Sequence, residues 1–83
     1  MSSKTIYRAD YRALVLGLRQ QREALGLSQT DVARALGWPQ QRLSAVEAGA
    51  RRLDVVEFVD LVGALGMTPT AALRLLTVKV SAQ

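Results

Sequence analysis

Two adjacent glutamines, Gln40 and Gln41, are the side chains whose chemistry stands out most in this sequence. A glutamine amide donates one hydrogen bond while it accepts another, which matches the N7 and N6 atoms of adenine in the DNA major groove. Both glutamines open a predicted short helix over residues 40–48, and Leu43 and Val46 are expected to face the core. The paired amides would then point into solvent, where they can form hydrogen bonds with a binding partner.

Two smaller residues share this outward face. Ser44 can hydrogen-bond several bases, and the methyl group of Ala45 can contact a thymine methyl. Both are also ordinary residues for a solvated helix surface, so contact with bases and simple exposure remain open alternatives.

Catalytic and metal chemistry find little support. The chain has no Cys and no His, which excludes disulfides and the usual zinc sites and removes the commonest nucleophile and general base. The remaining serines, carboxylates and tyrosines form no recognisable catalytic spacing. We therefore expect no enzymatic activity, no metal and no cofactor.

The charge distribution favours a polyanionic partner. The chain carries a net charge of +4, and nine of its eleven basic residues are Arg, the side chain best suited to phosphate. Residues 34–52 sum to +3, whereas residues 53–83 sum to −1. A basic face for a polyanion and a second face for another partner are expected, although ordinary surface charge would give the same pattern.

A chain of 83 residues corresponds to one small domain with a thin core. Because disulfides and metals are excluded, self-association is the remaining means of support. No apolar stretch is long enough to span a bilayer, and the first residues lack a signal-peptide hydrophobic region. The sequence predicts a cytoplasmic protein with no membrane contact, associated with the nucleoid if its partner is DNA.

The elements that must position the glutamines are short helices separated by glycines. Asp10 is expected to cap a helix over residues 10–24, which Gly17 interrupts. Ser28 and Asp31 form a predicted capping box for a helix over residues 29–36. The residues expected to face inward are Tyr11, Leu14, Val15, Leu18, Leu25, Val32, Ala33 and Leu36, and Pro39 fits the first turn of the helix over residues 40–48.

Two more helices complete the predicted all-α fold. Asp54 and Glu57 form a capping box, and Gly66 ends the helix that they start. Thr68 caps a helix over residues 69–76, with Leu73 and Leu76 inward. The alternation in Val78–Val80 permits a short strand, although a frayed end is favoured. The resulting organisation is a flexible arm over residues 1–9, a domain over residues 10–77 and a tail over residues 78–83.

The stretch from Leu18 to Leu73 resembles the Cro/C1-type helix-turn-helix family, also called the Xre family, which includes lambdoid phage repressors. The resemblance implies a five-helix lambda-repressor-like domain. In it, the helix over residues 29–36 crosses the DNA backbone and the helix over residues 40–48, the recognition helix, enters the major groove. It also implies a homodimer on a palindromic operator. The shared residues are Arg22, Leu25–Gln29, Val32, Ala33, Leu36, Gly37, Leu43, Val46–Gly49 and Ala64–Gly66.

The family resemblance also implies roles for single residues. Some phage repressors of the family carry two glutamines at the motif positions of Gln40 and Gln41 and use them to read bases. The position of Gln29 contacts the DNA backbone in the family, and the free amides of a helix start bind phosphate as well. Arg22 and Glu47 stand at positions that form a salt bridge between the first and third helices, which would hold the recognition helix in place.

The remaining basic residues near the recognition helix are candidates for phosphate contacts, namely Arg42, Arg51 and Arg52. Arg51 and Arg52 could instead bind carboxylates such as Asp54. The chain departs from the family pattern at Trp38 and Pro39, where a small apolar residue and a Ser or Thr cap are usual. This departure could start the recognition helix one residue early. Trp38 itself is expected to fill the core or the turn, with its indole N–H within reach of a phosphate as an alternative.

Taken together, the residues and the resemblance predict a dimeric, sequence-specific DNA-binding transcriptional regulator, in particular a repressor. The alternative is an antitoxin that binds DNA and neutralises a partner toxin through the acidic C-terminal half and the tail. A third possibility is a helical adaptor without DNA binding, whose affinity for its partner would barely respond to salt.

Overall fold

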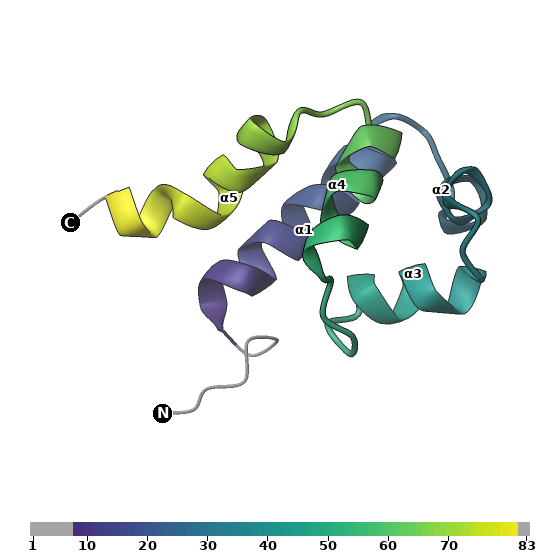
Figure 1. Cartoon of the computed structure of the whole chain (residues 1–83), viewed down its shortest axis with the longest axis horizontal. Coiled ribbons are helices and arrows are strands. Elements are labelled where there is room, and N and C mark those ends of the chain that lie inside the picture. Colours follow the sequence, from purple (N-terminus) through teal and green to yellow (C-terminus); the bar gives the residue numbers. More distant parts are fainter. Residues whose placement is uncertain (1–7, 82–83) are drawn as a thin grey trace.

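The computed structural model describes the backbone of residues 8–81 and the side chains as far as Leu75. Within these residues the chain forms five α-helices and no strand, so the predicted all-α fold is confirmed (Figure 1). The helices are α1 (Ala9–Ala24), α2 (Gln29–Leu36), α3 (Gln40–Glu47), α4 (Val55–Ala64) and α5 (Pro69–Ser81).

The core lies where all five helices meet. Helix α1 packs against α5 and α3, while α2 packs against α3 and α4 (Figure 1). Each helix turns its apolar stripe inward, which removes these side chains from water and stabilises the bundle. The most deeply buried large side chains are Leu43, Leu65, Val32, Val46 and Val62.

Local hydrogen bonds fix both ends of α2. The Ser28 hydroxyl accepts from the Asp31 amide at 3.0 Å, and the Asp31 carboxylate accepts from the Ser28 amide at 2.9 Å, which confirms the predicted capping box. At the other end of α2, Gly37 adopts a φ of +71°, a conformation that costs glycine little. The Trp38 amide then donates to the Ala33 carbonyl at 2.9 Å, so the chain turns sharply into α3.

The predicted starts of the last two helices are also confirmed. Asp54 accepts from the Glu57 amide at 2.7 Å, and Glu57 accepts from the Asp54 amide at 3.1 Å. The Thr68 hydroxyl accepts from the Ala71 amide at 3.1 Å. Each side chain satisfies a backbone N–H group that the first turn of a helix would otherwise leave unpaired.

Three expectations about helix ends in the first half of the chain are wrong. Asp10 does not cap α1: the helix begins one residue earlier, after the extended Arg8, and Asp10 lies in the first turn and pairs with Arg8 at 2.7 Å. Leu25 is 49% exposed because it lies past the last helical residue. Pro39 is not in the first turn of α3: it stands just before the helix with extended backbone, and α3 begins at Gln40, so no early start occurs.

The C-terminal helix differs more from the expectation. Helix α5 continues to Ser81, so the short strand that the alternation permitted at Val78–Val80 does not form. The backbone groups of this segment bond within the helix, and among residues 8–81 no strand exists to pair with it. Leu73 is 41% exposed, whereas Ala72 is fully buried and Leu75 packs against the core. The side chain of Leu76 and the outer residues of the predicted arm and tail (1–7 and 82–83) lie outside the described residues.

Helix α1 runs through Gly17 without interruption. A Cβ atom at this position would lie 2.6 Å from Cδ1 of Leu75 in α5. Gly17 therefore lets α5 approach α1 closely, and this packing role outweighs the low helix propensity of glycine.

Among residues 8–81, none of the helices is by itself long and apolar enough to cross a bilayer. Only α4 taken together with the first part of α5 has the length and composition of a membrane-spanning segment, and these two helices are bent by 106° relative to each other.

Candidate nucleic-acid interface

Helix α3 is anchored on one side and open on the other. Leu43 and Val46 are buried in the core. Gln40 and Gln41 are exposed, while Ser44 and Ala45 are half-buried. The four residues predicted to contact bases thus lie on the side of α3 turned away from its anchors, as the helical period requires.

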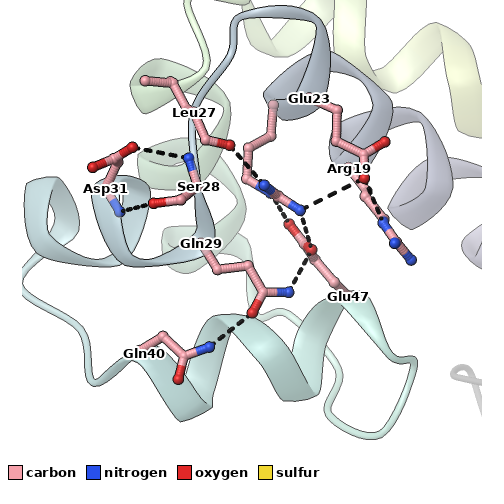
Figure 2. A network of polar contacts seen from close by, with 9 residues as sticks. Arg19, Glu23, Leu27, Ser28, Gln29, Asp31, Gln40 and Glu47 are labelled. Atoms are coloured by element: carbon pink, nitrogen blue, oxygen red, sulfur yellow. Dashed lines mark hydrogen bonds and ion pairs between the residues drawn. The ribbon is translucent and has the colours of Figure 1, made fainter.

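The amide of Gln40 is held by a neighbouring helix. Its Nε2 donates to Oε1 of Gln29 at 2.7 Å, and Nε2 of Gln29 donates to Oε1 of Glu47 at 2.8 Å (Figure 2). An amide nitrogen carries two hydrogens and an amide oxygen has two lone pairs. Gln40 therefore keeps its Oε1 and one N–H in a set orientation, which are the two groups that a bidentate contact with adenine requires.

Glu47, which ends this chain of contacts, is fixed by Arg22 of α1. The guanidinium donates to both carboxylate oxygens, from Nε at 2.7 Å and from Nη2 at 3.0 Å, and its Nη1 donates to the Leu27 carbonyl at 2.7 Å. The side chains of Arg22 and Glu47 are only 10% and 8% exposed. The hydrogen bond to Glu47 raises the pKa of Arg22 and outweighs the opposing effect of burial.

The resemblance implied the pair of Arg22 and Glu47, and the structure brings the two side chains together. The Gln29–Gln40 contact is a further feature that sequence reasoning missed. These residues are on different helices, and no local pattern indicates that their amides meet. Among the described residues, every buried side-chain nitrogen and oxygen has a hydrogen-bond partner, so this network leaves no buried polar group unsatisfied.

A second carboxylate lies on the opposite flank of α3. Glu57 of α4 accepts two hydrogen bonds from Arg51, at 3.0 and 2.9 Å, and its Oε2 lies 3.7 Å from Nη1 of Arg42. The hydrogen bond from Arg51 is the main cause that lowers the pKa of Glu57. Of the alternatives for Arg51, binding to a carboxylate therefore occurs in the structure, but the carboxylate is Glu57 rather than Asp54.

Trp38 occupies the turn before α3. It is half-buried and packs against the core, as expected for a turn filler. The guanidinium carbon of Arg42 lies 5.3 Å from the centre of its ring, a distance at which a cation and an aromatic face attract each other. The structure thus holds Arg42 between an indole and a carboxylate.

The other two predicted phosphate contacts lie in different places. Gln29 is the first residue of α2 and, with Arg42 and Arg51 on the opposite flank, borders the exposed side of α3. Arg52 is exposed in the segment between α3 and α4, but it lines a hollow with Tyr11, Leu14 and Leu73 of α1 and α5 rather than the surface of α3.

Known proteins share the helix-turn-helix sequence pattern and the fold of this chain. Residues 18–72, about two thirds of the chain, match the family model described as Helix-turn-helix. A solved structure, an XRE-family like protein from Pseudomonas syringae pv. tomato str. DC3000, is 41% identical in sequence and superposes with a TM-score of 0.82. The match covers 90% of this chain and 92% of that chain. No curated protein sequence matches the chain.

Proposed function

The chain belongs to the Xre family of DNA-binding helix-turn-helix regulators, and we propose that it is a repressor that binds a palindromic operator as a homodimer. The observation that carries this proposal is the orientation of the Gln40 amide, which Gln29 and Glu47 hold on the exposed side of α3. A preoriented amide pays less conformational entropy when it binds a base. Its place of action is then the DNA of the nucleoid, in the cytoplasm.

Base reading is assigned to four residues of α3. Gln40 offers Oε1 and one N–H to an adenine, and Gln41 is exposed beside it. Ser44 and Ala45, which are less exposed, are the other two base contacts. Gln29, Arg42, Arg51 and Arg52 bind phosphates on either side and set the register of α3 on the duplex.

Selection of bound sequences from random DNA, followed by mutation of the glutamines, tests this proposal. Gln40→Ala and Gln41→Ala should each weaken binding to the selected operator by about 1–3 kcal/mol and leave binding to unrelated DNA unchanged. Gln29→Ala should also lower discrimination between the two DNAs, because the Gln40 amide loses its support. Gln20→Ala, on the exposed surface of α1, is the matched control. Equal losses on both DNAs would contradict base reading.

The homodimer needs a surface away from α3. Helix α4 exposes Val55, Val56 and Val59, at 78%, 68% and 46%, and neighbouring exposed apolar side chains mark contact sites. We assign the contact with the second copy to this surface of α4.

The antitoxin alternative draws on the same exposed valines. A toxin bound to α4 would leave α3 available for DNA. Co-expression with the product of the adjacent gene separates the two functions: relief of toxicity supports the antitoxin, whereas a harmless neighbour supports the repressor.

A further inference from the structure

We infer that Glu57 is a positioning residue for DNA binding: it holds Arg42 and Arg51 together as a preassembled phosphate clamp beside the recognition helix. This inference rests on the proposed function, because the clamp serves DNA that α3 has entered. It adds a residue that never touches the DNA and whose own charge opposes binding.

The first argument is the number of contacts that converge on one carboxylate. Oε1 of Glu57 accepts from Arg51 at 3.0 Å and from the Asp54 amide at 3.1 Å. Oε2 accepts from Arg51 at 2.9 Å and lies 3.7 Å from Arg42. With a side chain only 13% exposed, Glu57 joins the recognition helix, the segment that follows it and the first turn of α4.

The second argument is what the two arginines leave available. Their side chains are 37% and 40% exposed. A guanidinium has five N–H donors, of which Arg51 uses two on Glu57. The remaining donors fit the oxygens of a phosphate. The indole of Trp38 supports Arg42 from another side, 5.3 Å from ring centre to guanidinium carbon.

Two physical effects of Glu57 act in opposite directions. Its negative charge lowers the attraction to DNA, although Arg42, Arg51 and Glu57 together still carry one positive charge. Its hydrogen bonds order two long side chains in advance, and each side chain that need not be ordered on binding improves affinity by a factor of roughly 2–12. We infer that ordering outweighs repulsion, so that removal of this negative charge weakens DNA binding.

The test compares two variants that lose the same charge from the same helix. Glu57→Gln removes the clamp support, and Asp60→Asn removes an exposed carboxylate of α4. Affinity for the selected operator is measured at one salt concentration. Glu57→Gln should bind about tenfold more weakly than the wild type, whereas Asp60→Asn should bind equally or slightly more tightly. A Glu57→Gln variant that binds as tightly as the wild type, or more tightly, would overturn the inference.

A double-mutant cycle separates positioning from a general effect on α4. If Glu57 acts through the arginines, Glu57→Gln should cause no further loss when Arg42 and Arg51 are already alanine. A loss that persists in that background would assign the effect to capping of α4 and refute the clamp. Thermal melts of each variant show how much protein is folded.

Arg51→Lys provides a measurement if Glu57→Gln does not fold. Lysine keeps the charge but lacks the planar fork that binds a carboxylate through two hydrogen bonds. Operator affinity should fall about fivefold, and wild-type affinity in this variant would refute the clamp. A wild-type protein without sequence preference would overturn the proposed function as well, whereas a sequence-specific protein with unaffected variants would overturn the clamp alone.

Discussion

At the scale of single residues, two carboxylates hold the side chains around α3. Glu47 fixes Gln29 and, through it, Gln40, whereas Glu57 fixes Arg51 and lies beside Arg42. Each carboxylate is largely buried and has an arginine partner, as a buried charge requires. The residues expected to contact DNA are thus oriented by residues that do not contact it.

The Arg22–Glu47 pair should be important for stability. Glu47→Ala leaves the Arg22 guanidinium buried without its partner. The free energy of unfolding should fall by an amount near the lower end of the range of about 3–5 kcal/mol that is typical of broken buried pairs. Urea unfolding measures the loss. The double variant Arg22→Met, Glu47→Leu should recover most of it, because no buried charge remains. A loss below about 1 kcal/mol for Glu47→Ala would mean that the pair behaves like an exposed one.

Glu57 should also make stability depend on pH. Its pKa is lowered from the ordinary 4.5, chiefly by Arg51, so the folded state binds fewer protons than the unfolded state in acid. Its contribution is complete above pH 4.5 and is lost as the pH falls below that value toward the lowered pKa. The difference in unfolding free energy between the wild type and Glu57→Gln should therefore shrink between about pH 5 and pH 3. A constant difference over this range, in urea unfolding, would contradict the assignment.

At the scale of helices, caps and close approaches determine where each element lies. The capping boxes start α2 and α4, and Gly37 sets the turn that leads into α3. Gly17 of α1 leaves room for Leu75 of α5, and the small Ala72 of α5 is fully buried. The position of α3 is therefore determined by its connections at both ends and by its buried Leu43.

Two helical glycines should respond to alanine in opposite ways. Gly63→Ala adds a methyl group in open space and should raise the free energy of unfolding by about 0.5–1 kcal/mol, because alanine loses less conformational entropy in a helix. Gly17→Ala must displace Leu75 and should lower it by about 1–3 kcal/mol. Melting temperatures of both variants at the same protein concentration check this, and a similar rise in both would show that α5 adapts freely.

At the scale of the whole molecule, the fold separates two surfaces. The exposed side of α3 is bordered by arginines, whereas α4 exposes valines. The first surface suits a polyanion and the second suits an apolar partner. A dimer formed through α4 would leave both recognition helices available for half-sites about 34 Å apart.

Placing a charge in the exposed surface of α4 tests this arrangement. Val56→Glu should shift the protein toward monomer in sedimentation and weaken operator binding, while the helical content stays the same. The salt dependence should remain steep in monomer and dimer, because log K falls by about 0.9 per neutralised phosphate for each unit of log salt concentration. Unchanged sedimentation would move the dimer contact elsewhere, and a flat salt dependence would favour the adaptor without DNA binding.

Local patterns in the sequence determined most of the fold. The capping boxes at Ser28 and Asp54 and the turn at Gly37 involve residues within a few positions of each other, so their hydrogen bonds follow from residue type and spacing. Helical periodicity likewise separated the buried Leu43 from the exposed Gln41. The buried face of α5 was predicted at Leu73 instead of Ala72, because periodicity favours the larger apolar residue for a buried position and does not show that the small alanine fills it.

Only the tertiary structure decided how the site is held together. Gln40 meets Gln29 across eleven positions, and Glu57 approaches Arg42 from another helix. Such contacts depend on the angle and distance at which helices pack, and these follow from the whole core rather than from any one segment. The residues proposed to face DNA were therefore visible in the sequence, whereas the residues that orient them became visible only when the helices were assembled.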